Sequence, residues 1–403
     1  MNKKSPRILV VAPFTHQNGH FVIFPRDISC ALQTIGCEVT LLHTRQFRTE
    51  LDWRGADIEH ICLRDQLEYA PWWWKEIWVR LANFPSAQCL AWIIWRVRPR
   101  EYDLILWTDF QAQSNLWPLA LARFLRLYRA KSAFFEHHPP DEQGRLGALL
   151  PKKLRTDRMR LAGLTMFVFS KHLLNQWETR LGSDKGLAYV PWGVWPQPFS
   201  EARRRHARHT LGIDDQTRVL LVFGVQAIER KHIDTLYEAA ATLTPSKPLL
   251  LLFVGAHVGA IPHPFSDWHR DSIEARIVDG FIPEKKVEEY FAAADAVWAN
   301  YRDFPGASGA LLQGMGFGRL SIASSAGEIG YLCGAHNLGP MVSSSDAAHL
   351  SAALEKFIAM PAEQQLAWES GIAATATHYA WPKIALQLMS QLGINGLNVQ
   401  ITA

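Results

Sequence analysis

Short apolar runs alternate with longer amphipathic stretches along almost the whole chain. Continuous runs such as 7–12, 104–107 and 132–135 are typical of strands that are buried on both faces of a parallel sheet. A turn and a stretch with helical spacing follow these runs, and the same alternation starts again at 218–223 and 249–254. Alternating strands and helices predict an α/β protein with parallel sheets.

A segment rich in proline and arginine, residues 196–208, separates the two series of elements, and we interpret it as a solvated linker. The length of 403 residues also suits two domains better than one core. We therefore expect two Rossmann-like doubly wound domains, at residues 1–195 and 196–375, followed by a C-terminal helical segment at 376–403.

The composition narrows the class of protein and of partner. Hydrophobic residues make up 48% and charged residues 20%, as in a globular protein. The net charge of +4 permits anionic ligands or an anionic membrane surface, but it does not indicate a nucleic-acid partner. The five cysteines form no CxxC pair, and their odd number argues against a disulfide framework, so we expect reduced thiols in a cytoplasmic protein.

No stretch predicts insertion into a membrane. The basic N-terminus leads into an apolar run that ends at Pro13 without a cleavage-like site, which favours a first strand over a signal peptide. No run of about 18 uninterrupted apolar residues occurs. Residues 69–99 nevertheless combine tryptophans with lysine and arginine, as segments at a membrane surface do. A tryptophan-rich pair of core helices explains the same pattern, so peripheral contact with the inner face of a membrane is one of two open interpretations.

The stretch from Tyr301 to Tyr331 carries the strongest local signal for ligand binding. A strand at 296–300 leads into a turn of small residues at 305–309, and a short apolar helix follows near 310–316. Free backbone N–H groups and the positive end of a helix would meet there, which makes a ready site for an anion. The alternative is that the glycines only let the chain turn.

A second candidate for anion binding lies upstream, where the strand 218–223 ends at Gly224. Arg230 and Lys231 follow at the junction of this turn and the next helix, on the side where a diphosphate would meet a helix N-terminus. A basic pair on a surface loop is the alternative.

Polar residues follow two predicted strands of the first half. Asp109 comes after the strand 104–107, and His137 and His138 come after 132–135. Ligands of open α/β sheets lie outside the carboxyl ends of the strands, so chemistry is expected there, although a structural role for the histidine pair stays open. Two adjacent histidines without a third ligand at metal spacing do not predict a metal site.

Five segments resemble one family of enzymes. They are 190–194 (VPWGV), 220–236 (LLVFGVQAIERKHIDTL), 279–283 (DGFIP), 290–296 (YFAAADA) and 380–385 (AWPKIA). Through them the chain resembles the GT-B-fold retaining glycosyltransferases of the large nucleotide-sugar-dependent family related to glycogen synthase and sucrose-phosphate synthase.

This resemblance implies a GT-B architecture, in which two Rossmann-like domains face each other across a cleft and the C-terminal helix returns to the first domain. It also implies transfer of a sugar from a nucleotide-sugar co-substrate, with retention and without a metal or other cofactor. The acceptor, a glycan, a lipid-linked molecule or a small molecule, would bind the first domain, including its turn at Asn18, Gly19 and His20.

The family's donor-binding positions fall in the second half. They are Gly224, Arg230, Lys231, Gly280, Phe281, Ile282, Asp303, Gly306, Ala307, Ser308, Gly309 and Gln313. Lys231 and Arg230 would neutralise the diphosphate, Gln313 would contact the ribose, and residues 280–282 would contact the base. The family's histidine near the transferred sugar falls on His138, with His137 adjacent.

The chain departs from the family at charged positions. The first of two motif glutamates falls on Pro305 and the second on Gln313, with Asp303 as a candidate substitute. The family's Gly-Arg pair reads Gly224-Val225, so Arg230 is the candidate replacement for the missing cation.

Two other function classes therefore stay open. One is a catalytically silent protein that binds nucleotide or glycan, or serves as a subunit of a complex; the other is an inverting transferase.

In the inverting case the general base would be a residue of the first domain. The candidates are His16, His20 and Asp109.

Overall fold

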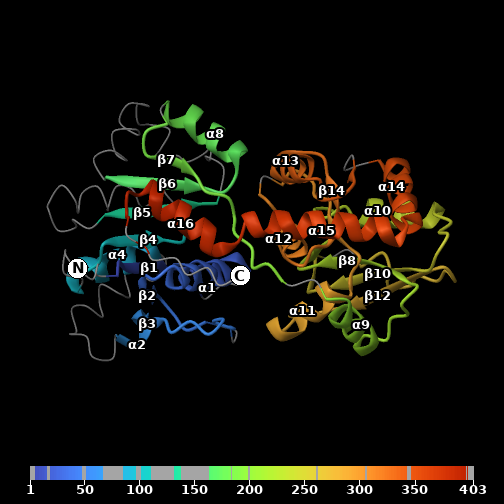
Figure 1. Ribbon diagram of the computed structural model, residues 1–403, viewed down its shortest axis with the longest axis horizontal. Coiled ribbons are helices and arrows are strands. Elements are labelled where there is room, and N and C mark those ends of the chain that lie inside the picture. The colour runs from blue at the N-terminus through green and yellow to red at the C-terminus, as the bar shows by residue number, and fades with distance from the viewer. Residues whose placement is uncertain are drawn as a thin grey trace. The chain divides into compact units, whose positions relative to one another are not determined.

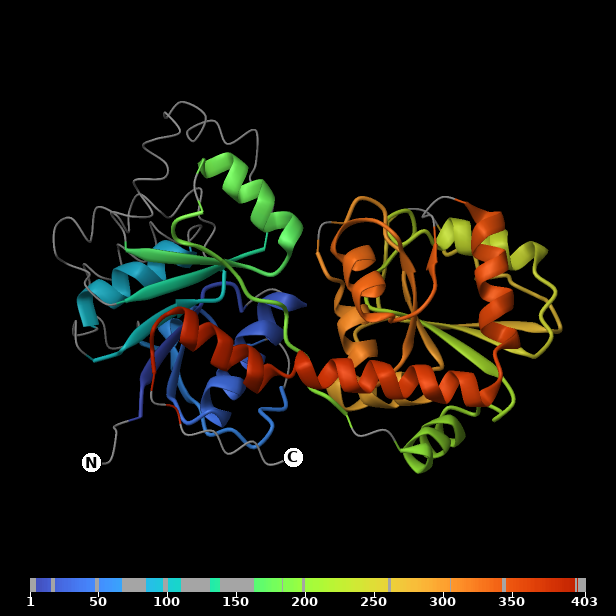
Figure 2. The same cartoon turned by 45° about the horizontal axis from the view of Figure 1, so that its top comes forward.

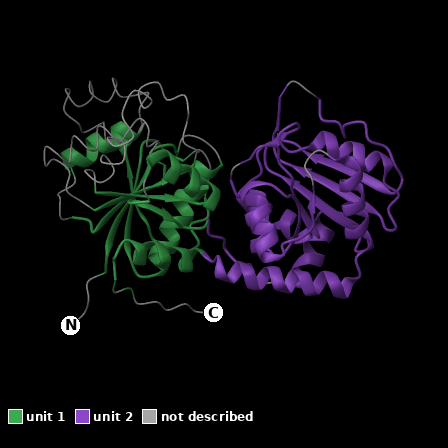
Figure 3. Cartoon of the chain, turned by 90° about the horizontal axis from the view of Figure 1, so that it is seen from above, with its two compact units in different colours: residues 1–191, 381–403 green, residues 192–380 purple. Residues whose placement is uncertain are grey.

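The computed structural model describes residues 5–15, 19–47, 51–66, 85–96, 101–109, 131–137, 163–182, 184–197, 200–259, 262–304, 306–342, 346–395 and 397. The chain forms two compact units, shown in Figure 3: unit 1 comprises 1–191 and 381–403, and unit 2 comprises 192–380. The sequence had placed the divisions after residues 195 and 375.

Unit 1 is built on a seven-stranded sheet of order β3-β2-β1-β4-β5-β6-β7, in which all pairs are parallel (Figure 1). The strands are β1 (Arg7–Ala12), β2 (Glu38–His43), β3 (Glu59–Cys62), β4 (Leu104–Trp107), β5 (Ser132–Glu136), β6 (Leu164–Val168) and β7 (Leu187–Tyr189). The apolar runs that predicted β1, β4 and β5 are almost completely buried, as expected of central parallel strands.

The described helices of unit 1 include one from the far end of the chain. They are α1 (His20–Thr34), α2 (Leu63–Gln66), α4 (Pro85–Arg96), α8 (Lys171–Leu181) and α16 (Trp381–Gln391). Helix α16 packs beside α1 (Figure 2), and the ring of Trp381 lies 5.7 Å from that of Phe24 on α1. Because α1 buries Phe24 and α16 buries Trp381, the C-terminal helix belongs to the core of unit 1, in agreement with the predicted return.

Unit 2 repeats the architecture with a six-stranded parallel sheet of order β12-β10-β8-β13-β14-β15. Its strands are β8 (Arg218–Phe223), β10 (Leu249–Val254), β12 (Ile273–Val278), β13 (Ala296–Ala299), β14 (Leu320–Ser324) and β15 (Met341–Val342). A small parallel pair, β9 (Gln226–Ala227) and β11 (His257–Val258), extends beyond β8 and β10.

The sheet of unit 2 is buried on both faces because successive side chains enter different cores. Leu220 and Val222 of β8 pack into one core, whereas Val219 and Leu221 pack into the other. The described helices that supply the rest of these cores are α9 (Glu201–Thr210), α10 (Ile233–Thr242), α11 (Glu284–Ala293), α12 (Gly309–Gly316), α13 (Gly327–His336), α14 (Ala347–Ala359) and α15 (Ala362–His378).

The predicted linker at 196–208 is wrong in its second half, because α9 starts at Glu201 and belongs to unit 2. Ser200 caps this helix by accepting a hydrogen bond from the backbone N–H of Arg203. Arg204 and Arg208, one helical turn apart, both bind the fully buried carboxylate of Asp295, with Arg208 at 2.7 Å. Arg204 and Arg208 therefore anchor α9 to the core of unit 2, whereas Arg205 on the same helix is exposed.

Candidate functional site

The carboxyl end of β8 begins the anion-site candidate of unit 2. Gly224 has a φ of 88°, and its N–H donates to the carbonyl oxygen of Val254 at 2.9 Å. A Cβ at Gly255, the residue after β10, would lie 2.3 Å from the Gly224 carbonyl oxygen, so glycine is needed at 255 for the ends of β8 and β10 to approach this closely.

Lys231 is buried behind this turn, with 4% of its surface exposed. Its Nζ donates a hydrogen bond to the carbonyl oxygen of Phe223 at 2.5 Å and lies 3.7 Å from the position that a Cβ on Gly224 would occupy. The indole N–H of Trp298 on β13 donates to the carbonyl oxygen of Lys231 at 2.7 Å, which fixes the backbone. Burial and, secondly, the neighbouring Arg230 lower the pKa of Lys231 to about 7.

Arg230 differs from Lys231 in its exposure, because its side chain reaches the surface. Its guanidinium carbon lies 5.2 Å from the ring centre of Phe304 and 5.9 Å from that of Tyr301. In the part of the chain that the structure describes, neither Arg230 nor Lys231 has an ion-pair partner. Arg230 and Lys231 are therefore two neighbouring basic residues with no carboxylate partner among the described residues.

The loop from β13 to α12 contributes Tyr301, Phe304 and Ser308. Ser308 is the N-cap of α12, since its hydroxyl accepts from the N–H of Leu311 at 3.4 Å and donates to the Tyr301 hydroxyl at 3.1 Å. Helix α12 then begins at Gly309, so Gly306, Ala307, Ser308 and Gly309 do precede or open a helix as predicted.

Two amide side chains of this region hold unpaired polar atoms. The Oε1 atom of Gln313, on α12, is buried and has no hydrogen-bond partner among the described residues. Asn300, directly after β13, is completely buried, and in the described part of the chain neither its side-chain oxygen nor its side-chain nitrogen has a partner. Buried polar groups are nearly always paired, so both amides are candidates to bind water or a ligand. Asn300 is not among the site residues predicted from the sequence, although a polar residue directly after a buried strand is a signal for such a site.

The other predicted donor-binding residues, Asp303 and 280–282, differ in their exposure to solvent. Asp303 has a φ of 46° and is exposed. Phe281, after β12, exposes 64% of its surface, whereas the next residue, Ile282, packs against a core of unit 2. The strands β12, β10 and β8 are parallel neighbours in the sheet. Residues 280–282, after β12, and Gly224, after β8, therefore both lie at the carboxyl ends of these strands.

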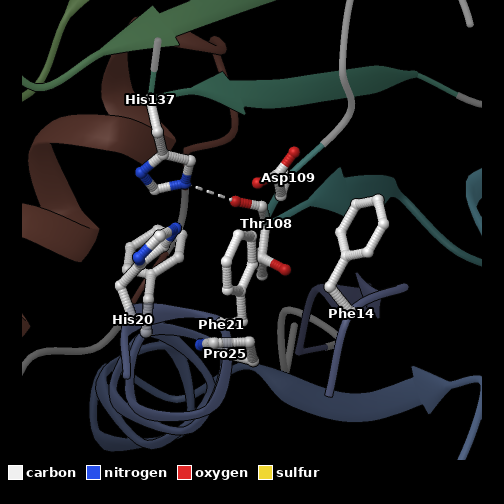
Figure 4. A pocket seen from close by; sticks show the side chains of 8 residues that line it. Phe14, His20, Phe21, Pro25, Thr108, Asp109 and His137 are labelled. Atoms are coloured by element: carbon white, nitrogen blue, oxygen red, sulfur yellow. Dashed lines mark hydrogen bonds between the residues drawn. The ribbon is translucent and has the colours of Figure 1, made fainter. Parts of the chain in front are cut away.

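In unit 1 the structure brings three predicted residues into one pocket (Figure 4). Asp109 follows β4, His137 follows β5, and His20 is the first residue of α1, so the carboxyl edge of the sheet places them together. The rings of His20 and His137 lie 4.9 Å apart. The pocket is otherwise mostly apolar, with Phe14, Phe21, Phe24, Pro25 and Thr108 on its walls.

The side chains of this pocket are held in fixed positions. The Nε2 atom of His137 lies 2.8 Å from the carbonyl oxygen of Thr108, so Nε2 carries the proton that is donated. Thr108 is held in turn, because its N–H and its hydroxyl both donate to the carbonyl oxygen of Val11. Asp109 is only 4% exposed.

One ligand atom each from His20, Asp109 and His137 lies within 4.8 Å of the others, so this set could hold a metal ion. Nε2 of His137 is engaged by the Thr108 carbonyl, however, and a metal at that atom would have to displace the hydrogen bond.

Several predicted residues lie outside the described residues. They are His16, Asn18, His138 and Pro305, together with 69–84 and 97–99 of the tryptophan-rich segment. The described part of that segment, α4, buries Cys89, Trp92 and Ile93 in the core of unit 1, which supports the core interpretation for these residues. None of the described helices combines the length and apolar character that crossing a membrane requires.

Residues 217–360 match the sequence model of a family described as "Glycosyl transferases group 1". This range includes the Gly224 turn, Lys231 and helix α12, so the match to this family lies within unit 2. A comparison with curated proteins finds no match.

Solved structures resemble the chain over nearly its whole length. Sucrose-phosphate synthase from Thermosynechococcus elongatus has a TM-score of 0.62 and 19% identity, with 97% of this chain and 98% of that chain covered. A glycosyltransferase from Rickettsia africae has a TM-score of 0.70 and 13% identity, with 98% and 100% covered. HepE from Anabaena, in complex with UDP and glucose, has a TM-score of 0.64 and 15% identity, with 96% and 99% covered. These likenesses confirm the predicted GT-B fold.

Proposed function

We propose, from the GT-B fold and the match of unit 2 to the group 1 glycosyltransferases, that the protein transfers a sugar from a nucleotide-sugar donor to an acceptor bound by unit 1. The observation that carries the proposal is Lys231, a buried cation at the carboxyl end of β8 with no carboxylate partner among the described residues. Lysine is seldom buried without a partner, because an isolated charge loses its hydration. An anionic ligand that binds at the Gly224 turn supplies the missing partner.

Loss of a nucleoside diphosphate is the charge-developing step of sugar transfer, and its stabilisation needs fixed positive groups. Lys231 and Arg230 provide two such groups. The backbone N–H groups at the start of α12, next to Ser308, provide a third source of positive potential. The amide oxygen of Gln313, on the same helix, has no partner among the described residues and in this proposal accepts a hydrogen bond from a ribose hydroxyl.

The pocket of His20, Asp109 and His137 is assigned to the sugar side of the reaction. Its carboxylate and imidazole groups are of the kinds that bind sugar hydroxyls. Transfer with retention and without a metal is the course that the family resemblance favours. In this scheme the pocket binds and orients, while unit 2 carries the leaving group.

HepE in its complex with UDP and glucose makes UDP the first nucleotide to test. The experiment is a thermal-shift screen of the purified protein with UDP, GDP, ADP, dTDP and their common sugar conjugates. A ligand at about one hundred times its dissociation constant stabilises by about 2.7 kcal/mol, which raises the melting temperature measurably. Lys231→Ala should lose the shift, whereas Lys356→Ala, which removes an exposed lysine from α14, should keep it.

A catalytically silent nucleotide-binding protein is the second candidate. Val225 after Gly224 and Pro305 at a motif glutamate position favour it, since both remove charge from the family's pattern. Binding of a nucleotide sugar with no release of the nucleoside diphosphate would support the silent protein. An inverting transferase would be recognised by the anomeric form of its product.

A further inference from the structure

The guanidinium of Arg230 rests on a pair of aromatic rings from another loop. The rings of Tyr301 and Phe304 are stacked, with centres 4.9 Å apart and planes 27° apart. Arg230 lies within 6 Å of both ring centres, at 5.9 Å from Tyr301 and 5.2 Å from Phe304. At this range the negative face of a ring attracts a cation.

This pair of rings, which we call the aromatic seat, is held rigidly. Tyr301 is 7% exposed, and its hydroxyl accepts a hydrogen bond from Ser308. A Cβ on Gly306 would come within 3.2 Å of the Phe304 ring, so only glycine leaves that ring its full space. The backbone N–H of Arg302 donates to the carbonyl oxygen of Arg230 at 2.9 Å, which ties the loop that carries the seat to the loop that carries the cation.

The seat holds Arg230 without cancelling its charge. Two other arginines of unit 2 are paired with carboxylates: Arg302 lies 3.9 Å from Asp234, and Arg319 lies 2.9 Å from Glu369. Arg230 has no such partner among the residues that the structure describes. A guanidinium on aromatic faces keeps its N–H groups available for phosphate oxygens.

The residue after Gly224 supplies no second cation. Val225 is 54% exposed and carries no charge, so the turn itself offers no second cation beside Lys231. Arg230, the sequence neighbour of Lys231, lies over the same Tyr301 ring as Lys231, at 5.9 Å and 6.0 Å from its centre, and its long side chain needs support to stay in one place.

We propose that Tyr301 and Phe304 are positioning residues that hold Arg230 beside Lys231, so that the two cations together bind a diphosphate and discriminate it from a single phosphate. The proposal rests on the proposed function, because it assumes that the anion at the Gly224 turn is the diphosphate of the donor. It assigns the aromatic seat a role in ligand preference that core packing alone does not require.

The test is isothermal titration of the intact protein with inorganic pyrophosphate and with inorganic phosphate. Removing the ring by Phe304→Leu should weaken pyrophosphate binding by about two- to fivefold and leave phosphate binding unchanged. Phe304→Tyr keeps a ring and should bind as the wild type does. Tyr237→Leu, which removes another partly exposed aromatic side chain of unit 2, serves as the matched control for stability.

A double-mutant cycle separates positioning from packing. Arg230→Gln should weaken pyrophosphate binding at least about tenfold, and Phe304→Leu should then have no further effect. Additive effects of the two substitutions, or an equal loss for phosphate and pyrophosphate, would overturn the proposal. If the wild type binds a nucleotide in the thermal-shift screen while Phe304→Leu leaves pyrophosphate affinity unchanged, only the seat is refuted. If no nucleotide binds at all, the proposed function itself is refuted.

Discussion

Lys231, which is only 4% exposed, donates its only described side-chain hydrogen bond to the backbone carbonyl of Phe223, at 2.5 Å. One carbonyl oxygen does not replace the hydration of an ammonium group, which in water satisfies three donors. The lysine is therefore costly for the free protein and favourable only when an anion arrives. Removing the charge of Lys231 should therefore raise the stability of the free protein and weaken the binding of an anionic ligand.

The first prediction follows from that cost. Lys231→Met should raise the free energy of unfolding by about 1–2 kcal/mol at pH 6 and abolish the thermal shift with nucleotides. Because burial lowers the pKa of Lys231 to about 7, the native protein carries the buried charge mainly below that pH. The stabilisation should be largest below pH 7 and shrink as the pH rises from 7 towards the unfolded-state pKa of about 10.4. Urea unfolding at pH 6 and pH 8 measures it, with Lys356→Met as control; a destabilised variant at pH 6 would contradict the prediction.

The second prediction concerns protons taken up on binding. A diphosphate next to Lys231 should raise its pKa above the value of about 7 in the free protein, so binding at pH 8 should take up close to one proton. At pH 6 the lysine is already protonated, and the uptake should fall towards zero. Calorimetric titrations at pH 8 in two buffers with different ionisation enthalpies count these protons.

The control for proton uptake is Lys231→Arg, because a guanidinium stays protonated at both pH values and cannot take up a proton. The same uptake in this variant would assign the proton to another group and would contradict the role of Lys231.

The third prediction concerns the buried carboxylate that anchors α9. Burial raises the pKa of Asp295, but Arg208, Arg204 and a hydrogen bond from Gln365 outweigh it, and the pKa is lowered on balance. Asp295→Ala should destabilise the protein by about 3–5 kcal/mol, since it leaves two arginines without their partner. The contribution of Asp295 is present above the unfolded-state pKa of about 3.9 and is lost as the pH falls below it. Unfolding curves at pH 7 and pH 3 test this, with the exposed Asp267→Ala as control; equal losses at both pH values would count against the ion pairs.

The fold was predictable because its strands are continuous apolar runs. Val219 to Val222 are buried whichever face of the sheet they point to, so a strand buried on both sides leaves an unambiguous pattern in the sequence. Helix α9 was not predictable in the same way. Its arginines resemble a solvated charge run until Asp295 is placed beside them, and that residue is 87 positions away from Arg208 in the chain.

The same distinction applies to the site. Asp109 and His137 follow strands directly, so strand ends alone predicted their place, and the Gly224 turn with Lys231 had a local signature as well. The aromatic seat under Arg230 and the contact of His20 with His137 depend on segments that meet only in the folded chain. No local pattern marks such pairs, because each residue type is equally at home in a core.

The last prediction separates the two parts of the site by substitutions in the unit 1 pocket. Asp109→Asn keeps the size of a buried side chain but removes its charge, and His137→Gln removes the imidazole that donates to Thr108. Because the pocket orients the sugar for transfer, both variants should lower the release of nucleoside diphosphate from the matching nucleotide sugar by about 100-fold. Both should keep the thermal shift with the nucleotide alone, because Lys231 and Arg230 belong to unit 2.

His172→Gln, on the exposed face of α8, is the matched control in unit 1 and should leave both measurements unchanged. Loss of the nucleotide shift in the Asp109 or His137 variant would show that these residues support folding or nucleotide binding instead of the reaction. Full activity in both variants would remove the pocket from the reaction altogether. The expected result is that the variants release less nucleoside diphosphate but still bind the nucleotide. Only this result assigns the chemistry of the sugar to unit 1 and the affinity for the nucleotide to unit 2, because the two measurements then respond to different residues.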